Sequence, residues 1–255
     1  MTKPIFDSSG IKGWTAAEGL VADDGAGSRL FLFVNEQTGT RPPRTYTVEA
    51  VGACYGFVYR GQATVHEEGK PTRVVNEGEW FQTSNGIKHL CVFSGVRVVV
   101  MQRVGYRGMS SVGGPIEALG RLRYIDGCSD TLLVPPMLKG EPCLNHLHFP
   151  PNIDQTAHTH PSTRFGVVVS GRGECETPEG VFPLLPGVVF HIPTGGVHKF
   201  RTSDPLSMDI IAFHPDSDFG PTNADHPMVN RTLVDGSKID NSDPRHAADV
   251  ISPWL

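Results

Sequence analysis

The stretch 157–171 reads AHTHPSTRFGVVVSG, and the stretch 187–198 reads GVVFHIPTGGVH. Successive side chains of an extended strand point to opposite faces, so His158 and His160 are expected to project from the same face of one strand. A Pro-x-Gly-Gly turn precedes His198 and is expected to bring a third imidazole beside the first two. Imidazole is a usual neutral ligand of first-row divalent metals. The two stretches therefore predict a three-histidine metal site in the mouth of a β-barrel.

The same two stretches resemble the two motifs of the cupin family. The first cupin motif is His-x-His, three residues, Glu, six residues and Gly, and the corresponding residues here are His158, His160, Arg164 and Gly171. The second motif is Gly, five residues, Pro-x-Gly, two residues and His, and it is matched at every position by Gly187, Pro193, Gly195 and His198. Arg164 is the one departure, because most cupins carry a metal-binding glutamate at that place.

A cupin site of three histidines without the glutamate is similar to those of gentisate- and salicylate-type, diketone-cleaving and thiol dioxygenases. The resemblance implies a non-haem Fe(II) dioxygenase that acts on a small substrate with a carboxylate or adjacent oxygens, such as a hydroxybenzoate or a diketone. Mn, Ni, Zn or Cu are the alternative metals, since three imidazoles bind most late divalent ions. A redox-neutral isomerase, cyclase or lyase is the second hypothesis. A non-catalytic bicupin that binds a small molecule is the third.

Composition supports a turn-rich β protein and argues against several partners. The 255 residues include 29 Gly and 21 Pro, and 38% are apolar. The net charge of −5 is spread without long runs, so neither nucleic acid nor a membrane is expected as a partner. The expected partners are a substrate and O₂, with a homodimer as the assembly considered. Five cysteines without a CxxC pair, and the absence of an apolar leader, favour a cytoplasmic protein with buried thiols.

An internal repeat predicts the fold class, which is all-β with two tandem cupin barrels of the jelly-roll type. The segment 55–61 aligns with 165–171 at a shift of 110 residues, and at a shift of 109 His89 falls beneath His198. At the first shift, Val48 and Ala50 occupy the places of His158 and His160. The N-terminal barrel is therefore expected to be metal-free, with His89 as a core or rim residue. The predicted boundaries are 1–105 for the N-terminal cupin, 106–140 for a linker and 141–255 for the metal-binding cupin with its tail.

Short apolar runs bounded by turn residues are expected to form the strands. The predicted strands are 29–34, 46–50, 54–59, 63–66, 72–75, 80–82, 89–93, 96–102, 131–137, 143–149 and 206–214. The segment 116–122 is expected to be either one short helix or a linker turn. The acidic segment 216–227 is expected to pack across the second barrel, and Trp254 to dock on a neighbouring surface.

Arg164 and several polar residues are candidates for roles beside the metal. Arg164 follows His160 by four residues and is expected to face inward, where its guanidinium either grips a substrate carboxylate or enolate or pairs with an acid such as Glu174 or Asp209.

His146 and His148 form a second His-x-His pair that lacks the flanking motif residues, so they are assigned to the pocket wall, with a ligand or a catalytic base as the alternative. Gln155 is expected either to donate to substrate or to satisfy loop backbone. His191 is expected to reach the cavity or to form a hydrogen bond in its wall.

Overall fold

The computed structural model describes residues 5–7, 19–35, 42–222 and 232–238. Every strand pairing in these ranges is antiparallel. In the same ranges the helical structure is limited to the 3₁₀ turn η2 (Ile125–Gly127), and no helix is long and apolar enough to span a bilayer. The all-β prediction is confirmed, and 116–122 is a linker that ends in a short strand rather than a helix.

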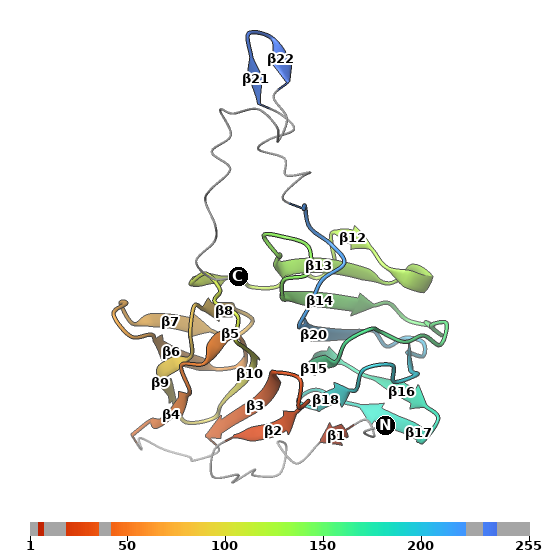
Figure 1. Ribbon diagram of the computed structural model, residues 1–255. Coiled ribbons are helices and arrows are strands. Elements are labelled where there is room, and N and C mark those ends of the chain that lie inside the picture. The colour runs from red at the N-terminus through yellow and green to blue at the C-terminus, as the bar shows by residue number, and fades with distance from the viewer. Residues whose placement is uncertain (1–4, 8–18, 36–41, 223–231, 239–255) are drawn as a thin grey trace.

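The first half of the chain forms a six-stranded and a four-stranded sheet (Figure 1). The larger sheet, in the order β11-β8-β5-β10-β3-β2, contains β2 (Leu20–Asp23), β3 (Ser28–Asn35), β5 (Gly52–Arg60), β8 (Trp80–Thr83), β10 (Val96–Val104) and β11 (Ser111–Gly113). The smaller sheet, in the order β4-β9-β6-β7, contains β4 (Arg44–Val48), β6 (Gln62–His66), β7 (Arg73–Asn76) and β9 (Ile87–Val92).

The second half repeats this plan with a seven-stranded and a three-stranded sheet. The larger sheet, in the order β1-β18-β15-β20-β14-β13-β12, contains β1 (Ile5–Asp7), β12 (Leu122–Arg123), β13 (Ser129–Val134), β14 (Cys143–Phe149), β15 (Arg164–Gly171), β18 (Val189–Ile192) and β20 (Met208–His214). The smaller sheet, in the order β17-β16-β19, contains β16 (Gly173–Thr177), β17 (Gly180–Leu184) and β19 (Lys199–Arg201). A separate hairpin pairs β21 (Leu233–Val234) with β22 (Ser237–Lys238).

All eleven predicted strands are present, with ends that move by a few residues. Strands also form in segments where none was predicted: β1 and β2 precede the expected first strand, β11 and β12 form in the predicted linker, and β16, β17 and β19 form in the second half. β1 joins the edge of the second half's large sheet, and β11 joins the equivalent edge of the first. Trp254 and residues 223–227 lie outside the described residues.

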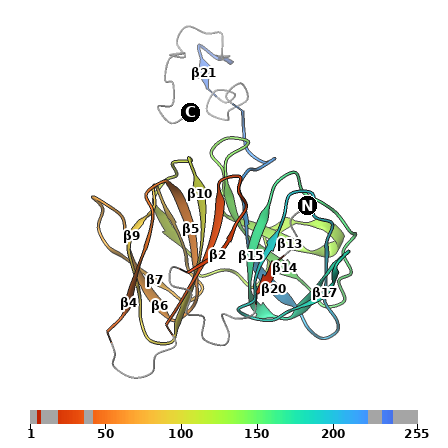
Figure 2. The same cartoon turned by 60° about the horizontal axis from the view of Figure 1, so that its bottom comes forward.

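Alternation along the strands divides the buried apolar residues into three clusters. One lies inside the first barrel and includes Phe81 and Val98, and a second lies inside the second barrel and includes Phe149 and Phe190. The third is shared by the two large sheets, whose outer faces meet between the barrels (Figure 2). Tyr55 and Phe213, one from each half, have ring centroids 5.1 Å apart within it. The two large sheets are therefore buried on both faces, and a residue's parity decides which core it enters.

A glycine–phenylalanine pair shows that the halves are structural repeats. Gly56 is paired with Phe81 across β5 and β8, and Gly166 is paired with Phe190 across β15 and β18. A Cβ on Gly56 would lie 2.0 Å from the Phe81 ring, and one on Gly166 would lie 2.2 Å from the Phe190 ring. In each half the aromatic ring lies over the glycine, so the repeat found in the sequence corresponds to a repeated packing unit.

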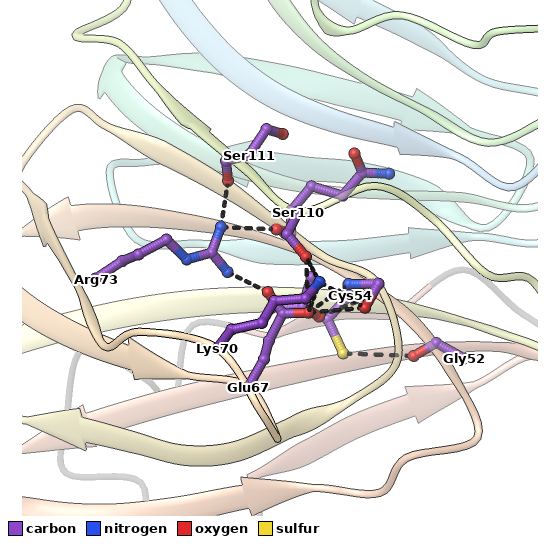
Figure 3. Close-up of polar contacts among 10 residues, drawn as sticks. Gly52, Cys54, Glu67, Lys70, Arg73, Ser110 and Ser111 are labelled. Carbon is purple, nitrogen blue, oxygen red and sulfur yellow. Dashed lines mark hydrogen bonds and ion pairs between the residues drawn. The ribbon is translucent and has the colours of Figure 1, made fainter.

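A polar network holds the segment after β10 against the first barrel (Figure 3). Glu67 is 3% exposed and accepts hydrogen bonds from Arg73, Lys70, Ser84 and Ser110. The shortest of these joins Arg73 Nη2 to Glu67 Oε1 at 2.6 Å. Burial by itself would raise the pKa of Glu67, but the hydrogen bonds from Ser84, Ser110 and Lys70 outweigh burial and lower it.

Replacing Gly56 by alanine should destabilise the protein by about 1–3 kcal/mol, because the added methyl overlaps the Phe81 ring. Urea unfolding of Gly56→Ala measures the loss. The penalty should shrink in a Phe81→Leu background, where the smaller side chain leaves room. An undiminished penalty would show that the overlap is not its cause.

Glu67→Gln should cost about 3 kcal/mol at pH 7, because it leaves Arg73 without its buried charge partner. The folded-state pKa of Glu67 is depressed, so its stabilisation is complete above the unfolded pKa and declines as the pH falls below about 4.3. Unfolding curves of both proteins between pH 7 and pH 3 should therefore converge in acid. A difference that stays constant over this range would contradict the ionised role of Glu67.

Candidate metal centre

Three histidines converge at one end of the second barrel. His158 and His198 form an isolated antiparallel bridge, with both backbone N–H groups donating to the opposite carbonyl at 3.0 Å. The Gly195 N–H donates to the carbonyl of His160 at 2.9 Å, so the Pro-x-Gly-Gly turn is fastened to the His-x-His segment. His158 and His160 thus lie in a bridged loop before β15 rather than in a continuous strand.

The three imidazoles face one another. Their ring centroids are 4.5 Å apart for His158 and His198, 5.0 Å for His158 and His160, and 5.2 Å for His160 and His198. One ring nitrogen from each lies within 4.8 Å of the others. Metal–nitrogen bonds of about 2.1 Å need ligand nitrogens about 3–3.5 Å apart, so small ring rotations bring these atoms to bonding distance.

Backbone carbonyls determine which nitrogen of two rings is free. His158 Nδ1 is 2.8 Å from the Thr156 carbonyl, and His198 Nδ1 is 3.0 Å from the Gly196 carbonyl. A carbonyl oxygen only accepts, so both Nδ1 atoms carry the proton and donate it, which leaves each Nε2 with a lone pair. Metal-binding histidines are usually oriented by such a contact. The donor set therefore fits a late divalent cation.

The surroundings keep the rings of His160 and His198 uncharged. Burial first, and then the positive charge of Arg164, lower the pKa of His160 to about 3. Burial is also the main cause that lowers the pKa of His198, to about 4. A neutral imidazole is the ligand form, so no proton has to be displaced when a metal binds at neutral pH.

Arg164 lies on the inward face of β15, level with the histidines. Its neighbour Phe165 belongs to the shared core between the barrels, so Arg164 points the other way. Among the described residues, all its hydrogen bonds are donated from Nη1, to Ser162 and Thr163, and its buried Nε has no partner there. The nearest acid is Asp216, at 3.9 Å, rather than Glu174 or Asp209. The Nε side of the guanidinium therefore makes no hydrogen bond to the described residues.

His214 is a fourth inward histidine that the motifs did not single out. It ends β20 and shares parity with Met208, Ile210 and Ala212, which are all in the core of the second barrel. Its ring centroid is 6.4 Å from that of His160. Burial, Arg164 and His160 lower its pKa. The alternation of the closing strand was the signal for this residue, since every second side chain from Met208 onward faces inward.

His146 and His148 lie on the opposite face of the same sheet, which corrects their assignment to the pocket wall. They share parity with Leu144, a member of the core between the barrels, whereas Leu147 and Phe149 face the barrel interior. His146 Nε2 and His148 Nδ1 lie 3.0 and 2.8 Å from the same oxygen of Asp209.

Asp209 also accepts a hydrogen bond from Ser170, at 2.5 Å. Burial would raise the pKa of Asp209, but the bonds from His146, Ser170 and His148 outweigh it and lower the pKa. The cluster is thus a polar link within the seven-stranded sheet, on its face toward the first barrel.

Gln155 and His191 are both buried, in different places. Gln155 Oε1 accepts from the N–H of Phe200 in β19 at 3.3 Å, and its amide nitrogen lies 3.5 Å from Cys128 Sγ, so it satisfies the backbone of a strand rather than of a loop. His191 has the parity of Val189, packs on Phe165 with centroids 4.9 Å apart and faces the first barrel. Neither of its ring nitrogens has a hydrogen-bond partner, so it neither reaches the metal side nor bonds in the wall.

The cysteines are free and inert. Four of the five are buried, and Cys91 is half-buried. Burial raises the pKa of Cys54, Cys143 and Cys175 to about 12 and that of Cys128 to about 11. None of these four is a thiolate at neutral pH.

The first barrel has apolar side chains at the place of the histidine bridge. Val48 is paired with Ile87, as His158 is paired with His198. The counterpart of His198 is therefore Ile87 and not His89, which is exposed and stacks on His66 with centroids 5.8 Å apart. The pairing of β4 with β9 has a register irregularity between Tyr46 and Val48. This irregularity explains why His89 does not occupy the place of His198, since a shift of one residue moves a side chain to the other face of the sheet.

Comparisons with known proteins agree with this geometry. Residues 145–213 match the sequence model of the cupin domain. No curated protein matches the chain.

Among solved structures the chain is similar to a cupin 2 conserved barrel domain protein from Leptotrichia buccalis, with a TM-score of 0.59, 16% identity and coverage of 84% of this chain and 96% of that one. It is also similar to the putative glyoxylate-induced protein from Pseudomonas aeruginosa, with a TM-score of 0.57, 13% identity and coverage of 85% and 90%. AerE from Microcystis aeruginosa gives a TM-score of 0.52, 12% identity and coverage of 73% and 85%. At these identities the likeness concerns the fold.

The wild-type protein should bind one Zn(II) per chain, measured by elemental analysis after dialysis and by calorimetry. His158→Ala and His198→Ala should each weaken binding by more than the roughly 10–100-fold that loss of an outer contact costs. His89→Ala is the matched control and should bind normally, because His89 is exposed on the other barrel. Full affinity in His158→Ala would overturn the assignment.

Proposed function

We propose that the protein is a metal-dependent dioxygenase, with Fe(II) as its metal, that acts on a small carboxylate-bearing or vicinal-oxygen substrate. The observation that carries the proposal is the convergence of three imidazoles with an arginine in place of the usual carboxylate ligand. When bound there, Fe(II) would supply open positions at which O₂ and a chelating substrate exchange electrons.

The residues around this site have separate roles in the proposal. His158, His160 and His198 hold the metal, and the carbonyls of Thr156 and Gly196 fix two of the rings. Arg164 binds the anionic group of the substrate through its unused Nε edge, with its Nη1 side anchored on Ser162 and Thr163. An arginine held in this way is already oriented, so less conformational entropy is lost when the substrate binds.

The missing carboxylate favours anionic substrates. A glutamate ligand would neutralise part of the positive charge of the cation, whereas three imidazole ligands do not reduce that charge. Arg164 adds a second positive charge close enough to lower the pKa of His160 and His198. Asp216, 3.9 Å from Arg164, is the only acid paired with it among the described residues, and it is half-exposed. The site therefore favours a small acid that chelates the metal.

A redox-neutral isomerase, cyclase or lyase is the second candidate. The same neutral donor set binds Zn, Ni, Mn or Cu as well as iron, and such an ion acts as a Lewis acid on a chelated oxygen. A site that binds a small molecule without chemistry is the remaining alternative.

The first barrel supports the second in this proposal. We infer that the chain is a bicupin in which a degenerate, metal-free cupin of residues 1–105 packs against the metal-binding cupin of residues 141–255. The boundaries are not strict, because β1 pairs with the second barrel and β11, β12 and β13 of the joining segment 106–140 extend the two large sheets. The proposal is completed by a cytoplasmic location, a homodimer as the assembly considered, and no nucleic-acid or membrane partner.

Oxygen consumption tests the proposed reaction. After anaerobic loading with Fe(II), a panel of hydroxybenzoates, catechols, diketones and thiols is offered with O₂. Uptake by the wild type that disappears in His158→Ala and persists in His89→Ala supports the dioxygenase. No uptake with any substrate, together with tight Zn(II) or Ni(II) binding, would favour the redox-neutral candidate.

Arg164→Met should raise the apparent KM for an acid substrate about 10–100-fold, because a charge-assisted pair is lost. Steady-state oxygen uptake gives the value. The Zn(II) affinity of the variant should stay within a few-fold of the wild type, since Arg164 is not a ligand. An unchanged KM would remove Arg164 from substrate binding.

A further inference from the structure

Asn145 is a buried amide on the inward face of the second barrel with an unused acceptor. It is 2% exposed and shares parity with Leu147, which belongs to the core of that barrel. Its Nδ2 donates to Asp130 Oδ2 at 2.7 Å, and its Oδ1 has no hydrogen-bond partner. A buried acceptor left unpaired costs about 1–3 kcal/mol, so it calls for an explanation.

Strand register places Asn145 one row below the inward residues that adjoin the metal centre. Arg164, at the start of β15, and His214, at the end of β20, lie side by side on the inward face of the seven-stranded sheet. On the next strand, Cys143 is paired with His214. Two residues further along β14, Asn145 is paired with Ala212, which is paired in turn with Gly166. The sheet neighbours of Asn145 toward Arg164 are thus Ala212, which is small, and Gly166, whose inward side is covered by the ring of Phe190.

Asp130 determines the direction of the amide. A carboxylate oxygen accepts from the amide nitrogen, so Nδ2 must point toward Asp130 and Oδ1 must point away from it. Asp130 is paired with Leu147 and so shares the inward face with Asn145. Arg164 and Asp130 both act electrostatically on Tyr124, which packs on the same core. The two polar groups therefore belong to one interior.

We propose that Asn145, oriented by Asp130, is the hydrogen-bond acceptor for a hydroxyl or amine of a substrate whose anionic group is bound by Arg164. This inference rests on the proposed function and narrows its substrate class to hydroxy- or amino-substituted acids. The enolate of a diketone lacks the donor that Asn145 requires. A site built to accept a hydrogen bond discriminates against the analogue without the donor, because its buried acceptor then stays unpaired.

Calorimetric titration of the Zn(II)-loaded protein with benzoate and the three monohydroxybenzoates tests the inference without relying on turnover. At least one hydroxybenzoate should bind the wild type about tenfold more tightly than benzoate. Asn145→Leu, which keeps the size of the side chain and removes the acceptor, should abolish this preference and leave the affinity for benzoate unchanged. Asp130→Asn should reduce the preference, because the amide loses its fixed orientation.

Arg164→Met is the matched comparison and should weaken all four acids by a similar factor while the preference remains. Thermal melting and Zn(II) stoichiometry of each variant show that the fold and the metal centre are intact, and Asp130→Asn provides a second variant if Asn145→Leu does not fold.

Equal binding of benzoate and every hydroxybenzoate to the wild type, no binding of any of them, or a preference that survives in Asn145→Leu would each overturn the inference. Failure of oxygen uptake with the preference present would instead overturn the proposed reaction and leave the role of Asn145 standing.

Discussion

The burial of both faces of the seven-stranded sheet is the constraint on which the rest of this structure depends. One face closes the second barrel and the other packs on the six-stranded sheet of the first half. Successive residues of the inner strands β14, β15, β18 and β20 therefore enter different cores. Phe165 and Phe213 join the two halves, while the residues next to them in sequence, Arg164 and His214, face the metal side. The same alternation thus builds the contact between barrels and the wall of the site.

The constraint explains why similar histidine patterns have different roles. His158 and His160 lie in a bridged loop at the barrel end, where the turn before His198 directs a third ring toward them. His146 and His148 are also spaced by two, but their strand turns them toward the first barrel, where Asp209 binds both. Spacing alone establishes that two side chains share a face, and it does not establish which face.

The two halves share the packing of the repeat, but they differ at the end of the barrel where the histidine bridge lies. The ring of Phe81 lies over Gly56 as that of Phe190 lies over Gly166, so the framework is the same in each barrel. At the bridge, Val48 and Ile87 fill with apolar atoms the place where His158 and His198 offer nitrogen. The first barrel thereby gains a continuous core, and its large sheet supplies the surface on which the second barrel rests.

The sequence by itself determined the strands, the repeat and the three histidines, because these depend on local alternation, turn residues and spacing that operate over a few positions. The segment 143–149 was predicted with the bounds that β14 has, and the repeat was visible at Gly56 and Gly166. Only the tertiary structure decided that His214 and Asn145 face the metal side, that His89 is displaced from the place of His198, and that Asp216 is the acid beside Arg164. Those outcomes depend on strand register, on a β-bulge and on which face each barrel covers. These are properties of how distant segments pair, so the sequence of a single segment does not determine them.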